Sequence, residues 1–358
     1  MKSNNQAKVI MLSGGGTGGS VTPLLALADY LKQDNPAVYN FIFVGTNSGP
    51  ERYLAESVQI LFLPIMSGKW RRYFSFKNVA DIFKIILAFF QALYLLRKYR
   101  PHLLISAGGF VSVPLAYAAY CLRIPVLIHQ QDIRAGLANR LMAKVAKRVT
   151  VTFVESLKDY GPKALWVGNP INERIDNSLN LWQKYNLDSN RPLLLVLGGG
   201  TGSVFINRLI KDSLKSLLEF CQVVHITGSG KKENLAPKTD YLPLEFIAHD
   251  EVLWFMAKAR AVVSRSGLGV LTEISALGQA SILIPMPNSH QEDNAAIFVE
   301  HQAAIVLSEK NLSTDVFINQ VRELMANKKL HDTLCSLAKD VIKSANEALK
   351  KIVNELLF

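Results

Sequence analysis

The sequence predicts an α/β protein made of two Rossmann-like domains in tandem, facing each other across a cleft. Short apolar runs without polar alternation recur between helical patterns, which is typical of parallel sheets covered on both faces. Two of these runs, Lys8–Leu12 and Leu193–Leu197, each lead into a glycine-rich turn and then a helical pattern. A Rossmann-like half begins in this way, and the two starts are separated by the length of a domain.

The other predicted strands follow in order, with helical patterns between them. They are Phe41–Val44, Leu103–Ser106, Val126–His129 and Val149–Phe153 in the first half, and Val223–Thr227, Ala261–Ser264 and Ser281–Pro285 in the second. Gly168-Asn169-Pro170 interrupts the pattern before a polar stretch. We therefore place the first domain at 1–166 and the second at 167–340.

Length and composition exclude several classes of protein. The 358 residues exceed the ~250–300 at which a single core stops growing, and 49% hydrophobic residues exclude intrinsic disorder. Three cysteines far apart exclude a disulfide framework and a cysteine zinc site, and they fit a reducing cytoplasm. No apolar run reaches the ~18–20 residues that cross a bilayer, and Ala7–Leu12 is too short for a signal peptide. We expect a soluble protein without a metal.

The positive charge is confined to the first half of the chain. Residues 1–170 hold 20 Lys and Arg against 8 Asp and Glu, whereas residues 171–358 hold 20 against 21. The net charge of +11 therefore belongs to the first half, which we expect to meet an anionic partner such as nucleic acid, a phosphate-bearing substrate or an anionic membrane.

The two glycine-rich turns predict anion binding, because a turn that enters a helix presents backbone N–H groups and a positive dipole end. A P-loop is excluded because Gly19, not lysine, precedes Ser20. A nicotinamide cofactor is disfavoured because Phe41–Val44 leads into Gly45-Thr46-Asn47 without an acidic residue. Two such domains suit a nucleotide-sugar glycosyltransferase that needs no cofactor, since a helix N-terminus can hold the leaving diphosphate.

A series of motifs supports this interpretation. In chain order they are Gly14-Gly15-Gly16-Thr17-Gly18-Gly19, Gly108-Gly109-Phe110-Val111-Ser112-Val113-Pro114, His129-Gln130-Gln131-Asp132 through Ala135-Gly136-Leu137-Ala138-Asn139-Arg140, Gly168-Asn169-Pro170, Gly198-Gly199-Gly200-Thr201-Gly202, Arg265-Ser266-Gly267 with Glu273, and His290-Gln291 with Asn294-Ala295. The series resembles the bacterial UDP-N-acetylglucosamine:lipid I N-acetylglucosaminyltransferases, a family of GT-B glycosyltransferases, over nearly the whole chain.

The resemblance implies an inverting, metal-independent transfer of N-acetylglucosamine from UDP-GlcNAc to the muramoyl 4-hydroxyl of a polyprenyl-diphosphate lipid. It implies that the backbone of Ile247 contacts the uracil, that Glu273 holds the ribose hydroxyls, and that His290 and Gln291 orient the sugar. The turn at Gly267-Leu268-Gly269 would place a helix N-terminus at the diphosphate. The other implied substrate-binding residues are Thr17, Gly18, Gly19, Asp132, Asn172, Gly200, Val270, Leu271 and Thr272. As in the family, a last helix at about 341–358 would return to the first domain.

The chain departs from the family where chemistry is expected. Ser20 stands at a position usually held by histidine, and the family's His-Glu-Gln-Asn becomes His129-Gln130-Gln131-Asp132. In the second domain Gly200 replaces a serine, Asn172 stands where an arginine is common, and Val270 replaces a frequent threonine. These changes leave the fold prediction intact and put the identity of the general base in question.

Asp132 is our hypothesis for that base, because it is the only carboxylate in the motif segments of the first domain. The alternative is that Asp132 merely turns the loop. Ser20 occupies the position of the family's catalytic histidine, but a serine hydroxyl is no general base near neutral pH. Its alternative role is to cap the following helix.

A basic and aromatic segment predicts a membrane-facing surface. The segment from Lys69 to Lys77 interleaves four cations with four aromatics, including Trp70, Arg71, Arg72, Phe74, Phe76 and Lys77, and precedes an apolar helix at Val79–Tyr99. Aromatics at headgroup depth beside cations are typical of peripheral binding to an anionic membrane surface. No nucleic-acid motif is present, so we expect no nucleic acid and a location at the cytoplasmic face of the bacterial cell membrane. Ordinary packing of this helix is the alternative.

Three other functions stay open. One is a related GT-B transferase with a different UDP-sugar or lipid acceptor. Another is a UDP-GlcNAc 2-epimerase on the same architecture, which needs no membrane and which the segment from Trp70 to Lys77 disfavours. The third is a divergent, non-catalytic UDP-sugar-binding relative, which Ser20 and Gln130 keep open.

Overall fold

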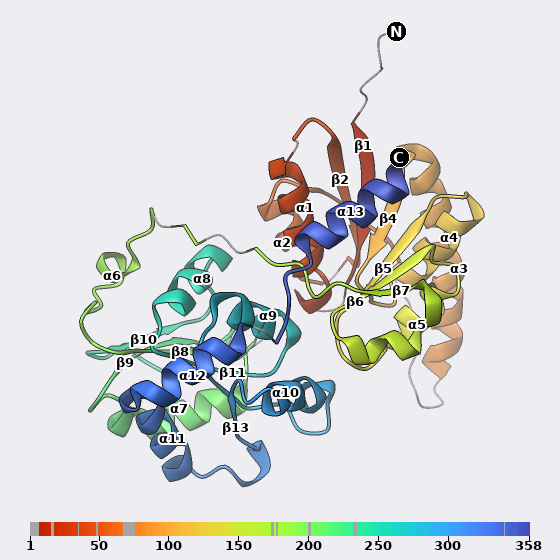
Figure 1. The fold of residues 1–358 in the computed structure, drawn as a ribbon. Helices are drawn as coiled ribbons and strands as arrows, with labels where there is room; N and C mark the ends of the chain where they lie inside the picture. The colour runs from red at the N-terminus through yellow and green to blue at the C-terminus, as the bar shows by residue number, and fades with distance from the viewer. Residues whose placement is uncertain are drawn as a thin grey trace. The chain divides into compact units, whose positions relative to one another are not determined.

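The protein is described here from a computed structural model, drawn in Figure 1. It describes residues 7–15, 18–34, 36–47, 49–66, 76–172, 175–176, 178–199, 202–231, 235–339 and 341–358, without the side chains of 76–82. The chain divides into two compact units: Met1–Asn172 with Ser344–Phe358, and Glu173–Lys343. The first unit therefore extends six residues past the predicted end at 166, and the chain returns to it at Ser344.

The first unit is built on a seven-stranded parallel sheet of order β3-β2-β1-β4-β5-β6-β7. Its strands are β1 (Lys8–Ser13), β2 (Tyr39–Gly45), β3 (Leu61–Pro64), β4 (Leu103–Ser106), β5 (Val126–Gln130), β6 (Arg148–Val151) and β7 (Ala164–Trp166). Its helices are α1 (Thr22–Asp34), α2 (Glu51–Ser57), α3 (Phe76–Tyr99), α4 (Ser112–Cys121), α5 (Leu137–Ala143) and α13 (Asn346–Leu357), with short 3₁₀ turns η1 (Gly18–Ser20), η2 (Val154–Asp159) and η3 (Gly161–Lys163).

Successive residues of the central strands enter different cores. Ile10 and Leu12 of β1 pack with α1 and α13, whereas Met11 between them packs with α3, α4 and α5 on the other face of the sheet. A strand buried on both faces needs apolar side chains at every position, which is why it reads as an unbroken apolar run. In Figure 1, α13 lies against the first unit beside α1.

Two chain segments at the end of the first unit are hydrogen-bonded to each other. The Ala345 N–H donates to the Asn169 carbonyl (3.0 Å), while the Asn346 side chain accepts from the Ile171 N–H (3.3 Å) and donates to the Ile171 carbonyl (2.9 Å). These bonds join residues 169–171, where the chain leaves the first unit, to residues 345–346, where it returns. Helix α13 therefore begins beside the point at which the chain leaves the unit.

The second unit holds a six-stranded parallel sheet of order β10-β9-β8-β11-β12-β13. Its strands are β8 (Leu193–Leu197), β9 (Gln222–Ile226), β10 (Tyr241–Leu244), β11 (Ala261–Ser264), β12 (Ser281–Leu283) and β13 (Ile305–Val306). Its helices are α6 (Leu181–Lys184), α7 (Val204–Leu217), α8 (His249–Lys258), α9 (Leu268–Leu277), α10 (His290–Glu300), α11 (Thr314–Ala326) and α12 (Lys328–Ala338), with the 3₁₀ turn η4 (Glu309–Asn311). Helices α7, α11 and α12 pack on one face of this sheet.

Each predicted strand is present, and the four additional strands, β3, β7, β10 and β13, are the edges of the two sheets. An edge strand has a neighbour on one side only and is less covered, so its residues alternate or stay half-exposed. A search for continuous apolar runs therefore finds central strands and misses edges. Within the described part of the chain, no helix combines the length and apolar character that crossing a membrane requires.

Candidate functional site

In the first unit, two glycine motifs meet where the chain order of the sheet reverses. β1 and β4 are neighbours, and the loops after them lie at the same carboxyl edge of the sheet. A Cβ at Gly109, whose φ is +91°, would lie 2.7 Å from the Gly15 carbonyl oxygen. Only glycine permits that backbone conformation and this approach of two backbones. The two loops thus form one surface rich in backbone polar groups.

Ser20 lies in the 3₁₀ turn η1, two residues before α1 begins. Its hydroxyl donates to the Gly15 carbonyl at 3.5 Å, so it contacts the glycine loop itself. Gly18 and Gly19 form the same turn, half-buried and exposed respectively. Thr17 lies outside the described residues.

The loop that carries Asp132 is organised by the buried amide of Gln130. The Gln130 Nε2 donates to the backbone carbonyls of Asp132 (2.6 Å) and Arg134 (3.2 Å). Its Oε1 accepts from the Asn139 Nδ2 (2.7 Å) and the Tyr160 hydroxyl (2.8 Å). A carboxylate at this position could accept both of the last two bonds but donate neither of the first two. The family's glutamate would therefore not hold this loop in the same way, and Asp132 is left half-buried at its start.

His129 is a structural residue in this arrangement. Its ring nitrogens contact the Thr150 hydroxyl (3.0 Å) and the Asn169 amide oxygen (2.8 Å), and the residue is 1% exposed. Burial lowers the pKa of His129 to about 4, although the bond to Asn169 acts in the opposite direction. A neutral imidazole with both nitrogens occupied links β5 to β6 and to the connection between the units.

A second carboxylate, which the motifs did not predict, lies beside the glycine loop. Glu51, at the start of α2, is fully buried, and its Oε1 accepts from the backbone N–H (3.0 Å) and the hydroxyl (2.6 Å) of Thr46. A Cβ at Gly15 would lie 2.6 Å from the same oxygen. The signal that could have found it is Gly45-Thr46 at the end of a buried strand, followed five residues later by a glutamate.

In the second unit, the glycine loop after β8 packs against the loop after β9. Gly202 has a φ of +72°, and a Cβ there would overlap the Thr227 carbonyl. The Lys231 ammonium donates to the Gly202 carbonyl at 3.0 Å, while the Asn207 amide donates to the carbonyls of Thr227 and Lys231, each at 3.1 Å. Lys231 thus brings a cation to this loop, which the sequence analysis did not predict. Gly200 lies outside the described residues.

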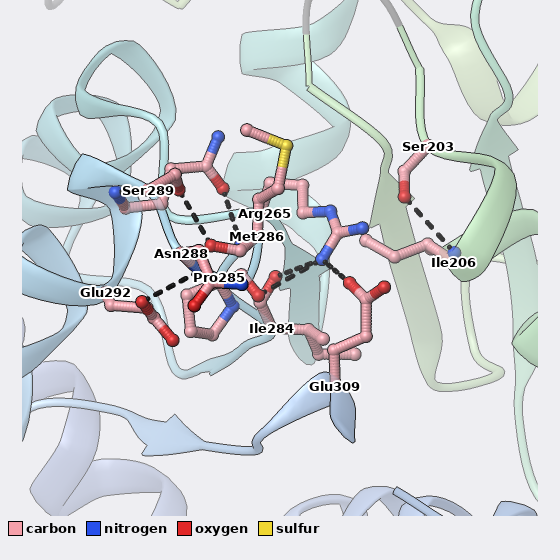
Figure 2. Close-up of polar contacts among 11 residues, drawn as sticks. Ser203, Ile206, Arg265, Ile284, Pro285, Met286, Asn288, Ser289, Glu292 and Glu309 are labelled. Atoms are coloured by element: carbon pink, nitrogen blue, oxygen red, sulfur yellow. Dashed lines mark hydrogen bonds and ion pairs between the residues drawn. The ribbon is translucent and has the colours of Figure 1, made fainter. Parts of the chain in front are cut away.

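Arg265 connects the ends of two neighbouring strands, as Figure 2 shows. Its Nη1 donates to the carbonyls of Ile284 (3.0 Å) and Pro285 (3.2 Å) and pairs with the Glu309 carboxylate at 2.5 Å. The side chain of Arg265 is largely buried, so a charged hydrogen bond here holds the turn that leads into α9. Arg265 belongs to one of the predicted motifs, which gave it no role of its own.

Helix α9 begins without a side-chain cap from its own N-cap residue. Gly267 takes an extended conformation before Leu268 and has open space where a Cβ would stand. The first-turn N–H groups, those of Leu268, Gly269 and Val270, have no acceptor within the helix. The first intrahelical bonds start at Leu271, whose N–H donates to the Gly267 carbonyl (3.1 Å), and the Thr272 hydroxyl donates to the Leu268 carbonyl (2.8 Å). This opening can hold an anion on backbone amides.

Glu273, one helical turn further along α9, lies beside α8. Its Oε1 is 3.8 Å from the Nε2 of His249, the first residue of α8. Burial raises the pKa of Glu273, and the nearby His249 acts in the opposite direction. Ile247 is 7% exposed and precedes α8 by two residues, so the structure brings the predicted uracil and ribose positions to one place.

The loop before α10 carries the two residues predicted at the sugar. The Gln291 Oε1 accepts from the Met286 N–H (3.0 Å), and Ser289 caps α10 while its hydroxyl donates to the Met286 carbonyl (2.7 Å; Figure 2). His290 is exposed at the first position of the helix. The loop is therefore held by its own side chains, with His290 directed outward.

The remaining predicted positions fall elsewhere. Asn172 is half-buried at the end of the first unit. Trp70, Arg71, Arg72 and Phe74 lie outside the described residues, and Phe76 and Lys77 begin α3 with side chains outside the description. Among the described residues, no three His, Cys, Asp or Glu side chains gather closely enough to hold a metal ion.

Helix α3 continues from that segment with an exposed apolar stripe. Its members, 48–65% exposed, are Phe83, Ile86, Leu87, Phe90 and Tyr94. Their spacing of three and four residues places them on one face of the helix.

Comparison with known proteins identifies the family. Residues 10–151 match the family model of the glycosyltransferase family 28 N-terminal domain, and residues 193–355 match that of the glycosyltransferase family 28 C-terminal domain. A UDP-N-acetylglucosamine--N-acetylmuramyl-(pentapeptide) pyrophosphoryl-undecaprenol N-acetylglucosamine transferase from Clostridium kluyveri is 37% identical over 97% of this chain and 98% of its own length. The chain belongs to glycosyltransferase family 28. The resemblance stated from the motifs is thereby confirmed, and the chain is a glycosyltransferase.

Other relatives agree with this family 28 assignment. A transferase of the same name from Lachnospira eligens is 36% identical over 97% of this chain and 98% of its length. The crystal structure of Acinetobacter baumannii MurG matches with a TM-score of 0.72 at 25% identity, covering 97% of this chain and 99% of that one. The prediction of two Rossmann-like α/β domains is confirmed.

A structure of the Neisseria meningitidis UDP-GlcNAc 2-epimerase also matches, with a TM-score of 0.71 over 98% of this chain and 99% of that one. At 14% identity this likeness concerns the fold alone.

Proposed function

We propose that this chain transfers N-acetylglucosamine from UDP-GlcNAc to the muramoyl 4-hydroxyl of polyprenyl-diphosphate-linked lipid I, with inversion at the anomeric carbon. The product is the disaccharide lipid precursor of peptidoglycan. The observation that carries the proposal is the 37% identity, nearly end to end, with a transferase whose name states this donor and this lipid-linked acceptor.

The donor side of the proposal rests on the second unit. The uncapped first turn of α9, from Gly267 to Val270, would hold the diphosphate on backbone N–H groups. Glu273 would accept bonds from the ribose, Ile247 would meet the uracil, and the loop bearing His290 would meet the sugar. Arg265 and Lys231 would support these positions by fixing the turn into α9 and the glycine loop.

In the reaction, a bond forms between the acceptor oxygen and the anomeric carbon as the bond from that carbon to the UDP oxygen breaks. UDP leaves with the bonding electron pair, and the proton of the acceptor hydroxyl must pass to a base. We assign this proton to the Asp132 carboxylate, because the neighbouring Gln130 is an amide that cannot take it and that instead holds the Asp132 loop through the carbonyls of Asp132 and Arg134. Gln130 is thus a positioning residue.

Replacing Asp132 by Asn tests the assignment. We expect turnover to fall by ~10²–10⁴, because an amide cannot take the proton, while UDP affinity stays unchanged. The assay follows radiolabelled UDP-GlcNAc with membranes that contain lipid I and resolves lipid disaccharide from epimerised nucleotide. Glu155→Gln, an exposed carboxylate of the same unit, is the matched control.

Near-normal turnover of the Asp132 variant would remove it as the base. Donor binding by the unaltered protein without any product, or epimerised nucleotide as the product, would refute the proposed transfer itself.

We also propose that the first unit binds the anionic membrane surface at the cytoplasmic face of the cell membrane, through the exposed stripe of α3 and the basic segment before it. Phe83 and Phe90 are 65% and 61% exposed, and the last turn of the helix carries Arg97 and Lys98. Apolar side chains beside cations are typical of peripheral membrane binding. That the chain binds no nucleic acid stays a prediction.

The double substitution Phe83→Ser with Phe90→Ser tests this surface. We expect binding to vesicles with anionic lipid to fall at least about 10-fold, since two aromatic side chains no longer leave water. Vesicle co-sedimentation measures it, with Val299→Ser and Val316→Ser, exposed apolar residues of the second unit, as the control pair. Equal binding by both doubles would exclude α3 as the membrane contact.

A further inference from the structure

His249 lies beside the largely buried carboxylate of Glu273 without a direct hydrogen bond to it. Its Nε2 is 3.8 Å from the Glu273 Oε1, whereas a hydrogen bond between nitrogen and oxygen spans ~2.7–3.2 Å. The two atoms are therefore close enough to contact the same ligand atom and too far apart for a direct hydrogen bond.

The two side chains differ in exposure. The Glu273 side chain is 16% exposed and that of His249 is 47% exposed, so the carboxylate lies deeper than the imidazole. The acidic neighbour Glu251 on α8 is already engaged by the Lys184 ammonium (2.5 Å) and the Tyr185 hydroxyl (3.3 Å). Glu273 is therefore the carboxylate that faces His249 within ion-pair distance.

One hydroxyl oxygen, placed beside the line that joins these two atoms, can contact both of them. An oxygen at about 2.8 Å from both atoms completes a triangle with the 3.8 Å side. A hydroxyl can donate to the carboxylate and accept from the imidazole N–H at the same time. An ammonium can only donate and a carbonyl can only accept, so neither satisfies both groups.

We propose that His249 is a ribose-binding residue that, together with Glu273, clasps one ribose hydroxyl of the uridine nucleotide and so selects ribonucleotides over deoxyribonucleotides. The inference rests on the proposed function, in which Glu273 meets the ribose. Ile247, two residues before His249, is the position expected at the uracil, so a nucleoside held there brings its ribose towards α8.

Titration calorimetry of the full chain with UDP, 2′-deoxy-UDP and 3′-deoxy-UDP tests the proposal. We expect His249→Ala to weaken UDP binding about 3–30-fold, the effect of one lost hydrogen bond. For the deoxynucleotide that lacks the clasped hydroxyl, the unaltered protein already binds weakly, and His249→Ala changes its affinity less than about 2-fold. If His249→Ala no longer weakens the binding of 2′-deoxy-UDP, the shared group is the 2′ hydroxyl. If it no longer weakens the binding of 3′-deoxy-UDP, the shared group is the 3′ hydroxyl.

Two further variants sharpen the result. His249→Gln retains an N–H donor and should recover part of the UDP affinity, whereas His301→Ala, an exposed histidine of the same unit, should leave all three affinities unchanged. Equal weakening of all three nucleotides by His249→Ala, or no weakening of any, would overturn the proposal. Failure of the unaltered protein to bind UDP would instead refute the donor assignment.

Discussion

At Glu273 the protein holds a carboxylate where burial disfavours its charge. Burial raises the pKa of this group, so the folded state binds the carboxyl proton more tightly than the unfolded state. Stability from this group is therefore present at low pH and is lost as the pH rises through the raised pKa. A group that destabilises the empty protein at neutral pH is expected where a ligand supplies the missing hydrogen bonds.

Glu273→Gln should consequently raise the melting temperature of the nucleotide-free protein at pH 7.5 while weakening UDP binding about 10-fold or more, as a charged hydrogen bond becomes neutral. The stability difference between the two proteins should shrink as the pH is lowered toward 4.5. Calorimetric melting and titration measure both, with Glu300→Gln, an exposed residue of α10, as control. A variant that melts lower than the unaltered protein would contradict the argument.

Among the elements, α13 shows how a distant segment completes a domain. Leu349, Ile352 and Val353 of α13 join the core formed by α1 and the strands of the first unit. The side chain of Asn346 bonds both backbone groups of Ile171 and is 6% exposed. Since these backbone groups are buried, removing their partner leaves two polar groups unsatisfied.

Asn346→Ala should lower the free energy of unfolding of the first unit by about 1–3 kcal/mol, the cost of leaving a buried backbone group unbonded. Urea unfolding followed by circular dichroism measures the change. Glu355→Ala, an exposed position on the same helix, should change it little. If the two variants unfold alike, the bonds between the connections contribute nothing to stability.

In the molecule as a whole, each unit contains one buried neutral histidine. Burial lowers the pKa of His129 in the first unit and of His225 in the second to about 4, from an ordinary 6.5. Below pH 6.5 the unfolded chain takes up protons that the folded chain does not. The contribution of these two histidines to the free energy of unfolding is therefore fully present above pH 6.5 and falls as the pH drops toward 4.

Between pH 6.5 and 4, we expect each histidine to lower the free energy of unfolding of its unit by about 3 kcal/mol. In the second unit, the raised pKa of Glu273 should offset part of this loss. Melting temperatures at pH 7.5, 6 and 5 measure the effect, and His301→Ala should leave the profile unchanged. A melting temperature that is constant from pH 7.5 to 5 would contradict the expected protonation.

How much was predictable depends on where a residue's partners lie. Central strands such as β1 and β8 were predicted because both of their faces are buried, whereas the edges β3 and β13 left only weak patterns. The turn at Gly267 before α9 was recognisable from its motif. Nothing local marked His249 or Lys231, whose contacts come from other elements.

By itself, the sequence determined the two Rossmann-like units, their glycine turns and the family, because each of these depends on burial or backbone conformation within a short stretch. Tertiary structure alone decided that Gly15 meets Gly109, that Glu51 lies beneath that loop and that His249 faces Glu273. The physical reason is the order of the parallel strands. This order brings the carboxyl ends of distant segments to one edge of a sheet. The sequence around each side chain that lies there does not indicate which distant side chains it will contact.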